Sequence, residues 1–583
     1  MPAGTTATSR LWSARLAVPA SFIVFLLLRV VAWANDPLLE SQDSLSYLQS
    51  AKALMSLDPD RIIGLSPDAT LFYPFLTAFL GSAVGSIESG ARLGSLFLSC
   101  LLCSALVVIG KRIATTAEIA IGLLILAVSP FFVRFSYSVL SEPTYVAIVY
   151  LGIALFLTRL HDPRPASAAL IGMVFGAGFL TRFEGILYLA AIPAFQLAHF
   201  IVTGPRRYDL RRLGIWAMAF VLSFCSVAAI QVWRVSERLG YFALNGRQTW
   251  AVILHEPGGK SYEERMFGLD YSPTQINREY LREHPEALGR MVSRAGYGAT
   301  LQAYAKSIYV NLRTLWDRRL GAILGPLALV FFAFGLLEVY RRGGIVHVSA
   351  VLAFLGLGVS APLAHDAGLV ALRHFAVIGP LVILIEGMGI VALGQAIASA
   401  RHGPGKRAHL IVPGLLALAI GTALVPLGKL LFLPDRHNGE YRPGDFAIPA
   451  RLVHDISAGE PRRPARIAAR TGYFTYFSDS KRVAVPYTDY QPLVDYLAQN
   501  HVDFLFLEHR ELEDYPFLAR FAEGHTGAEF ERLYQGQDAA GDTLELYRFL
   551  HDTRGVMTPP GTNDDCATHD RPMGALKCRS TYL

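Results

Sequence analysis

Charged residues are scarce in this chain, and their scarcity is the first constraint on its class. Only 17% of the 583 residues are Asp, Glu, Lys or Arg, whereas 52% are hydrophobic. Soluble domains carry about 25% charged residues, so the composition argues for a membrane protein. The net charge of +6 does not indicate nucleic-acid binding, because the basic residues lie in short clusters between apolar runs, as orientation signals do.

Several chemical motifs are also missing. The chain has no zinc-type Cys/His spacing, no phosphate-cradling GxxxxGK[ST] loop and no dinucleotide fingerprint. Of only five cysteines, Cys100, Cys103 and Cys225 lie in apolar runs, where packing is favoured over the redox pairing that the first two could make. Cys566 and Cys578 can pair only if the polar C-terminal tail lies in an oxidising compartment. No internal repeat suggests a transporter built from two related halves.

Long apolar runs are abundant, and the first follows a polar start with Arg10 and Arg15. It covers Leu16–Ala34 and contains one charge, Arg29. Ala32-Trp33-Ala34 would fit a signal-peptide cleavage site, but the run is longer than the usual apolar core of about 7–15 residues. We therefore favour an uncleaved first span. In either case the basic flank stays in the cytoplasm and the residues after the run emerge outside.

Ten further runs predict spans: 91–110, 118–135, 142–158, 166–182, 185–203, 213–232, 319–340, 345–363, 374–396 and 408–432. The apolar segment Leu71–Ile87 is short and carries Pro74 near its start. If it crossed, the next basic cluster, Lys111-Arg112, and all later ones would lie outside, so we interpret it as an interfacial or re-entrant helix. Five of five basic connections then lie on the cytoplasmic side. The prediction is a mostly α, polytopic protein with about eleven spans, its N-terminus inside and its C-terminus outside.

The polar segments divide the rest of the chain into expected domains. Residues 1–432 form the transmembrane domain, with a first external loop at 35–90 and a second at 233–318 that is expected to form amphipathic helices on the outer face. Residues 433–550 have a soluble composition and predict a small external α/β domain with strands at Arg466–Arg470, Val502–Leu507 and Leu544–Phe549 and a helix at Gln491–Asn500. Residues 551–583 predict a loosely ordered tail.

The most acidic part of the membrane half is the stretch from Asn35 to Pro74. Within it Asp43, Tyr47 and Ala51 recur every four residues, which places them on one side of a short helix. A carboxylate at the membrane rim beside an aromatic ring is well placed to deprotonate an acceptor hydroxyl. The alternative is that Asp43 only caps a helix that starts at Ser44.

Other ionisable residues gather at the predicted outer ends of spans. Such residues at membrane depth are costly and are functional candidates by default, although loop ends are polar in every membrane protein. Together with Glu40 in the first loop, the candidates are Glu142, Arg182, Glu184, Arg373 and His374.

Seven stretches in this order carry a family resemblance. They are DSLSYLQSA, FYPFLTAFLG, ESGARLGSLFLSCLLCSALVVIGKRI, AVSPFFVRFSYSVLSEPTY, GFLTRFEGILYLAAIP, ALRHFAVIGPLVIL and the stretch from Arg466 to His509. The chain resembles the GT-C superfamily of polytopic glycosyltransferases, which use sugars carried on a polyprenyl phosphate. It is most similar to the bacterial branch with lipid A aminoarabinose transferase and the protein mannosyltransferases. The resemblance covers most of residues 16–550.

The resemblance implies that Asp43 is the catalytic base. Two departures qualify it: Ser44 stands where many members have a second acid, and Phe72-Tyr73-Pro74 where some have a basic residue before proline. The phosphate contacts are therefore expected elsewhere. On physical grounds we assign them to Arg373 and, second, Arg182, since arginine can grip two phosphate oxygens at once; Arg373 pairing only with lipid headgroups is the alternative.

A single base without a second nucleophilic carboxylate predicts direct displacement with inversion at the sugar's anomeric carbon. No cofactor is predicted, although Glu40, Asp43 and Glu142 could converge on a divalent cation. The expected partners are a polyprenyl-phosphate sugar, a glycan, lipid or protein acceptor, and membrane lipids, with no nucleic acid. The expected location is the cytoplasmic membrane, with the site facing outward. The rival function is a secondary transporter or lipid flippase. Asp43→Asn is expected to lower turnover and to leave donor affinity nearly unchanged.

Overall fold

The structure is a computed structural model that describes most of the chain. The described residues are 5–35, 42–63, 65, 69–161, 164–203, 209–239, 242, 244, 305, 308–313, 327–363, 372–402, 408–432, 443–458, 464–470, 472–509, 512, 516–538 and 541–550. They form two compact units, a helical unit that ends with Phe432 and a second unit that begins with Pro443. Glu40, most of the second external loop, the tail from residue 551 and both tail cysteines lie outside the described residues.

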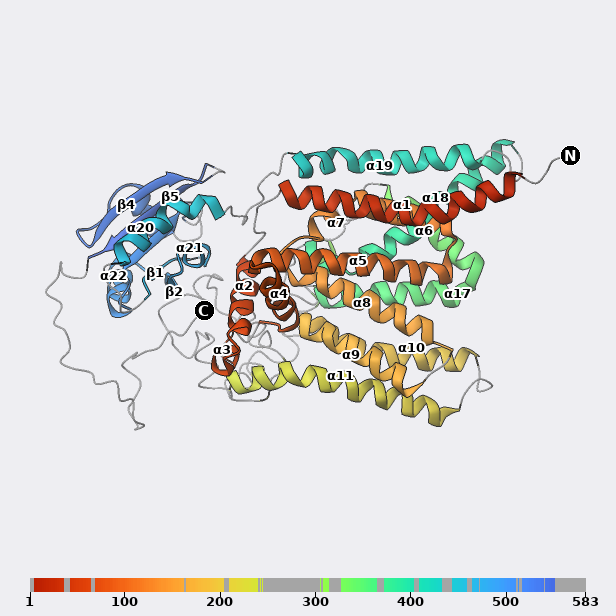
Figure 1. Cartoon of the computed structure of the whole chain (residues 1–583), viewed down its shortest axis with the longest axis horizontal. Coiled ribbons are helices and arrows are strands. Elements are labelled where there is room, and N and C mark those ends of the chain that lie inside the picture. Colours follow the sequence, from red (N-terminus) through yellow and green to blue (C-terminus); the bar gives the residue numbers. More distant parts are fainter. Residues whose placement is uncertain are drawn as a thin grey trace. The chain divides into compact units, whose positions relative to one another are not determined.

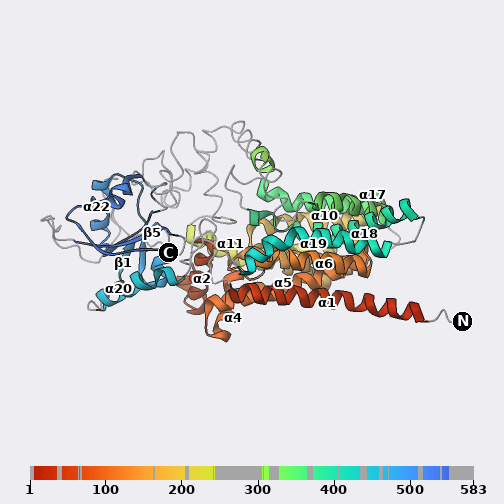
Figure 2. The same ribbon diagram turned by 90° about the horizontal axis from the view of Figure 1, so that it is seen from above.

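The helical unit is a bundle whose long helices run roughly parallel or antiparallel (Figures 1 and 2). Its elements are α1 (Thr5–Asn35), α2 (Gln42–Met55), α3 (Pro59–Ile63), α4 (Phe72–Val84), α5 (Ile87–Ile113), α6 (Thr116–Val128), α7 (Pro130–Phe135), α8 (Ser141–Arg159), α9 (Pro165–Thr181), the 3-10 turn η1 (Phe183–Ile186), α10 (Leu187–Thr203), α11 (Leu210–Leu239), α17 (Ala328–Leu363), the 3-10 turn η3 (Leu372–Phe375), α18 (Gly379–His402) and α19 (Ala408–Phe432).

The prediction of a mostly helical membrane protein is confirmed. Among the described residues, eight helices are long and apolar enough to cross a membrane, and Phe72–Val84, Thr116–Val128 and Pro165–Thr181 are shorter apolar helices. One of the eight, α17, contains the non-helical residue Gly344 with φ +66°, a left-handed conformation that glycine adopts without strain. Gly344 therefore separates two segments where the sequence predicts two spans. The count of eleven crossings and their orientation stay predictions.

Two predicted spans have different limits in the structure. The run 118–135 is not one helix, because Pro130 has no N–H to continue the hydrogen-bond ladder; α6 ends at Val128 and α7 begins at Pro130. The run 374–396 begins with a 3-10 turn, and the regular helix α18 starts only at Gly379. Polar residues lie at both breaks: Ser129 between α6 and α7, and Arg373 and His374 in the 3-10 turn before α18. None of them lies within a long regular helix.

Helix α4 is too short to cross a membrane. Its 13 residues extend about 20 Å at 1.5 Å per residue, against about 30 Å of hydrocarbon. The chain then reverses at Gly85, with φ +75°, and α5 returns so closely along α4 that a Cβ on Gly90 would meet the backbone of Gly81 at 2.3 Å. Phe75 and Phe79 are exposed on the other side. These features support the interpretation of this segment as interfacial.

The buried Arg29 ties α1 into the bundle. Its guanidinium donates to the carbonyl oxygens of Leu126 and Ala127, both at 3.1 Å, and to Ser136 Oγ at 2.8 Å. The two carbonyls end α6, where a helix leaves carbonyls without intrahelical partners. Arg29 thus satisfies carbonyl oxygens at the break before Pro130 and attaches α1 to α6.

The two ends of the bundle have different character. Helices α2, α3 and α4 gather at the end opposite the start of α1 (Figure 1). At the end of the bundle where α1 begins, Arg342 of α17 forms an ion pair of 2.7 Å with the buried Glu118 of α6. At the same end, His199 Nε2 lies 3.2 Å from His161 Nδ1. These contacts join connections that the sequence predicts to share the cytoplasmic side.

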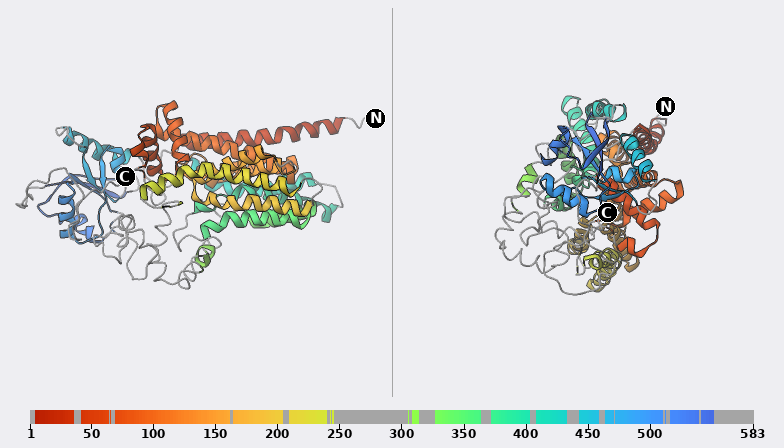
Figure 3. Two further views of the ribbon diagram at one scale, coloured as in Figure 1. Left: turned by 90° about the horizontal axis from the view of Figure 1, so that it is seen from below. Right: turned by 90° about the vertical axis from the view of Figure 1, so that its left-hand side faces the viewer.

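Glycines allow α9 and α11 to lie close together. The left view of Figure 3 shows α11, in yellow, along the bundle. Gly172 and Gly176 are four residues apart on α9, and a Cβ on Gly172 would lie 2.4 Å from the carbonyl oxygen of Phe220 in α11. This small-xxx-small spacing is how membrane helices bring their backbones into contact. Since α9 carries Arg182 at its end, the contact fixes that end of the bundle.

The second unit is a small α/β fold. Its elements are η4 (Pro443–Phe446), α20 (Ala447–Ser457), β1 (Arg466–Ala468), α21 (Tyr473–Phe477), β2 (Lys481–Val483), α22 (Tyr490–Gln499), β3 (Phe504–Glu508), η6 (Pro516–Leu518), α23 (Ala519–Ala522), β4 (Phe530–Gln537) and β5 (Thr543–Phe549). The five strands have the order β2-β1-β3-β5-β4, with β1 parallel to β2 and β3, and β5 antiparallel to β3 and β4. The three predicted strands and the predicted helix are present, within a few residues of their expected limits.

Candidate active site

Asp43 lies in the first turn of α2, and α2 is held in place by Tyr47. The Tyr47 hydroxyl lies 2.7 Å from Ser141 Oγ at the start of α8, and its ring meets Tyr73 of α4 edge-on with centroids 5.3 Å apart. Leu48 and Ala51 of α2 are fully buried. Since α2 begins at Gln42, Asp43 lies within its first turn and not before a helix that starts at Ser44. Its carboxylate is engaged elsewhere.

The partner of Asp43 is Arg373, which comes from η3 and is 330 residues away in the chain. The guanidinium of Arg373 pairs with the Asp43 carboxylate, and its Nε lies 3.3 Å from Glu142 Oε1. The Asp43 side chain is 53% exposed, that of Arg373 22% and that of Glu142 only 4%. Burial opposes the charge of Arg373, but the carboxylates of Glu142 and Asp43 outweigh it and raise the pKa of Arg373 above its usual range.

Glu142 also binds a second arginine. Arg182 lies 2.7 Å from the same oxygen, Glu142 Oε1, and donates to both oxygens of Glu184, at 2.8 and 3.3 Å. The result is an alternating row of charges that we call the charge chain: Asp43, Arg373, Glu142, Arg182 and Glu184. It runs from an exposed carboxylate at the rim to a buried group of three.

The turn from α9 to η1 explains why Arg182 and Glu184 lie together. Arg182 leaves the helix with extended backbone angles, and its carbonyl accepts from Gly185 N at 3.0 Å. The chain here passes so close to α9 that a Cβ on Gly185 would meet Phe179 N at 2.5 Å. This tight turn presents both side chains to the same space.

A buried tyrosine fixes the segment that carries Arg373. The Tyr150 hydroxyl, from α8, donates to the Val377 carbonyl at 2.9 Å and accepts from Leu381 N at 2.9 Å. Both backbone groups lie at the start of α18, where helical N–H groups lack intrahelical partners. Tyr150 therefore sets the position of η3 relative to α8, which carries Glu142.

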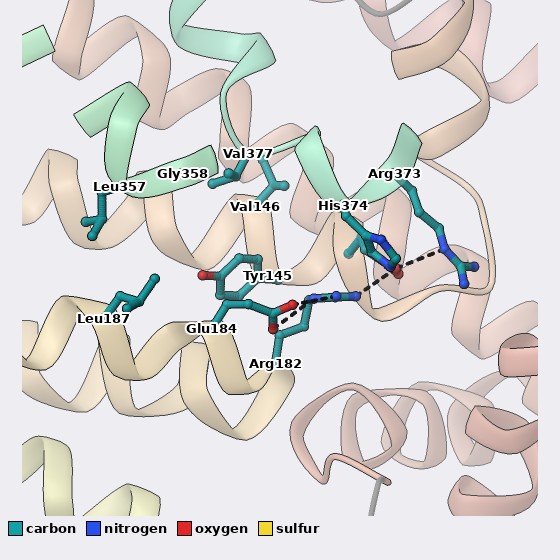
Figure 4. Close-up of a pocket in the computed structure, with 11 residues that line it drawn as sticks. Tyr145, Val146, Arg182, Glu184, Leu187, Leu357, Gly358, Arg373, His374 and Val377 are labelled. Carbon is teal, nitrogen blue, oxygen red and sulfur yellow. Dashed lines mark hydrogen bonds and ion pairs between the residues drawn. The ribbon is translucent and has the colours of Figure 1, made fainter. Parts of the chain in front are cut away.

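A small, partly open cavity adjoins the buried part of the charge chain (Figure 4). In Figure 4, Arg182 and Glu184 approach from one side and Arg373 and His374 from another. The lining is Glu142, Tyr145, Val146, Arg182, Glu184, Leu187, Leu357, Gly358, Arg373, His374 and Val377. The cavity thus combines a polar end with an apolar wall, the composition typical of small-molecule sites.

Most residues predicted from the sequence meet here. Asp43, Glu142, Arg182, Glu184, Arg373 and His374 belong to the charge chain or the cavity, and Tyr47 supports them through Ser141. Burial, with Glu142 and Asp43 adding to it, raises the pKa of Tyr47, so this phenol stays neutral. Tyr145 was missed, although it lies three residues after Glu142 and so on the same side of α8. No sequence signal marks Leu357 or Gly358.

Two expectations about charged ligands stay predictions. Arg182, the second candidate for phosphate binding, pairs with two carboxylates, Glu142 and Glu184. For a metal, the part of the chain that the structure describes contains no group of three or more His, Cys, Asp or Glu side chains suited to hold an ion. Glu40 lies outside that part, and Arg373 lies between Asp43 and Glu142. Tyr73 stands before Pro74, where some members of the resembled family have a basic residue. Its side chain is fully buried against Tyr47, so it contributes to packing.

Comparisons with known proteins agree with this architecture. Residues 68–233 match the family model described as dolichyl-phosphate-mannose-protein mannosyltransferase. No curated protein matches the chain. Among solved structures, the archaeal oligosaccharyltransferase AglB from Archaeoglobus fulgidus, in complex with an inhibitory peptide and a dolichol-phosphate, has a TM-score of 0.57 at 12% identity and covers 93% of this chain and 74% of its own.

A second solved structure is ArnT from Cupriavidus metallidurans bound to undecaprenyl phosphate. Its TM-score is 0.52 at 13% identity, and the match covers 93% of this chain and 98% of that one. At these identities the likeness is one of fold alone. Together with the family-model match over residues 68–233, it agrees with the resemblance expected from the sequence.

Proposed function

We propose that this chain, which has the fold of the GT-C glycosyltransferases, is itself a membrane glycosyltransferase. It transfers a sugar from a polyprenyl-phosphate donor to an acceptor hydroxyl on the outer side of the cytoplasmic membrane. The acceptor is a glycan, a lipid or a protein. Two matched structures contain polyprenyl-type lipid phosphates, dolichol-phosphate and undecaprenyl phosphate, and this supports a donor of the same chemical class.

One observation carries the proposal: Asp43 and Arg373, from distant parts of the chain, meet beside a partly enclosed cavity. The reaction needs both kinds of group. A carboxylate must take the proton of the acceptor hydroxyl, and a cation must stabilise the lipid phosphate that leaves. Arg373 is suited to the second task because the neighbouring carboxylates keep it charged and a guanidinium can bind two phosphate oxygens.

The proposed step is a direct displacement. The acceptor oxygen forms a bond to the anomeric carbon while the bond from that carbon to the phosphate oxygen breaks. The hydroxyl proton goes to Asp43, the bonding electrons leave with the phosphate, and Arg373 stabilises the released polyprenyl phosphate. With no second carboxylate acting as nucleophile, the anomeric configuration inverts. Asp43, which is half exposed, can be reached by an acceptor from outside the bundle.

A lipid-turnover assay tests the function. Membranes containing the protein are given undecaprenyl-phosphate sugars labelled in the sugar, and loss of label from the lipid fraction is followed. The wild-type chain should release undecaprenyl phosphate, whereas Asp43→Asn should be slower by about 10²–10⁴-fold, the usual contribution of a general base. Asp60→Asn is the matched control, because Asp60 is an exposed carboxylate on the adjacent helix α3. A transporter or flippase, the rival predicted from sequence, would leave every donor intact.

A further inference from the structure

One buried oxygen of the charge chain has no partner. Glu142 Oε1 lies near both Arg182 and Arg373, but Glu142 Oε2 has no hydrogen-bond partner among the described residues. The Glu142 side chain is only 4% exposed and lines the cavity. A buried acceptor without a donor is costly, so a ligand that supplies a donor at this point is strongly favoured.

Two other charged groups of the cavity are already paired. Arg182 pairs with Glu142 and Glu184, and both oxygens of Glu184 accept from Arg182. The engaged arginine cannot bind an additional carboxylate without losing one of these partners. The lining therefore offers an unfilled acceptor, Glu142 Oε2, next to Arg373, which pairs with Asp43 on the side of the rim.

We infer that this cavity is the donor-sugar site and that Glu142 Oε2 accepts a hydrogen bond from a hydroxyl or amino group of a sugar that carries no carboxylate. This inference rests on the proposed function, since it assigns the substrate class of the same site. The anomeric phosphate lies toward Arg373 and the sugar ring lies against the apolar wall formed by Val146, Leu187 and Val377. An acidic sugar is disfavoured because its carboxylate would meet Glu142 Oε2, an acceptor that needs a hydrogen-bond donor.

The difference between sugars is large enough to measure. A hydrogen bond to a charged group typically changes affinity by about ten- to a hundredfold, and a carboxylate placed against Glu142 loses that bond and adds repulsion. We therefore expect a donor with a neutral sugar to bind at least about tenfold tighter than one with the corresponding uronic acid.

The experiment measures displacement of radiolabelled undecaprenyl phosphate from the purified full-length protein. The competitors are undecaprenyl phosphates linked to glucose, glucosamine and glucuronic acid, which share the same ring configuration. The expected result is that the glucose-linked lipid competes at least about tenfold better than the glucuronic acid-linked lipid. The glucosamine-linked lipid shows which group of the sugar donates the hydrogen bond to Glu142. If it competes as well as the glucose-linked lipid, a hydroxyl donates; if it competes better, the ammonium group donates.

Two variants locate the effect. Glu142→Gln should reduce the glucose-to-glucuronic acid ratio to near one, because its amide presents a donor to the cavity. Glu184→Gln makes the same change of charge in the same cavity and should keep the ratio, because both Glu184 oxygens already accept from Arg182.

The outcomes separate the two proposals. A wild-type ratio near or below one, or an equal loss of the ratio in both variants, overturns the inference while the proposed function stands. If undecaprenyl phosphate itself does not bind, the proposed function fails and the inference fails with it. The wild-type ratio decides the matter even if Glu142→Gln does not fold.

Discussion

Replacing Asp43 by Asn should have two opposite effects, and the second follows only from the structure. The amide cannot accept a proton, so turnover should fall by about 10²–10⁴-fold. The substitution also removes the anionic partner of Arg373, which the donor phosphate must otherwise displace. The sequence alone suggested that donor affinity would stay nearly unchanged, because it could not show that Asp43 and Arg373 are paired with each other.

The size of the second effect follows from the exposure of the pair. Asp43 is 53% exposed and Arg373 22%, so water screens much of their attraction, and such pairs contribute at most about 1 kcal/mol. Removing the competitor should therefore tighten binding of undecaprenyl phosphate by up to about fivefold. Glu142 remains 3.3 Å from Arg373 and keeps it in place.

The assay is displacement of radiolabelled undecaprenyl phosphate from purified wild-type protein, Asp43→Asn and the control Asp60→Asn, alongside turnover of a labelled donor. Tighter lipid binding with slow turnover in Asp43→Asn alone supports both assigned roles. Unchanged or weaker lipid binding would show that Asp43 and the phosphate do not compete for Arg373. Near-normal turnover would remove Asp43 as the catalytic base.

Three further predictions concern the support of Arg373 and the topology. Arg373→Ala should weaken undecaprenyl phosphate binding by about ten- to a hundredfold, and Arg373→Lys by much less because the charge survives; equal affinities in the wild type and Arg373→Ala would contradict the role. Tyr150→Phe removes two hydrogen bonds at the start of α18 and should cost about 1–3 kcal/mol in thermal or denaturant unfolding, with weaker lipid binding; unchanged stability and lipid binding would show that Tyr150 does not position η3. A reporter active only outside the cytoplasm should be active when fused after Asp58, Ser89, Pro257 or Asp445 and inactive after Lys111, Arg164, Arg207, Arg341 or Lys406; activity after Lys111 would mean that α4 crosses the membrane.

The sequence determined the class of the protein and the composition of its site. Apolar runs of span length and basic clusters between them reflect the transfer of side chains into lipid, which depends on local composition and needs no knowledge of packing. The same logic identified Glu142, Arg182, Glu184 and Arg373, because charged residues at membrane depth are rare. The strands β1, β3 and β5 were recognisable as apolar runs, whereas β2, with three residues, and β4, with a mostly polar face, carry too weak a pattern.

Only the tertiary structure decided how these residues are paired. Asp43 and Arg373 are 330 residues apart, and no spacing rule relates positions on helices that meet only after packing. The close contact of α9 with α11, the turn at Gly185 and the Tyr150 bridge to α18 together set which carboxylate faces which guanidinium. That pairing assigns Arg182 to the two buried carboxylates, places Arg373 at the rim beside Asp43, and leaves one oxygen of Glu142 without a hydrogen-bond partner among the described residues. Local sequence could not show this, because hydrogen bonds and ion pairs depend on distances between distant parts of the chain.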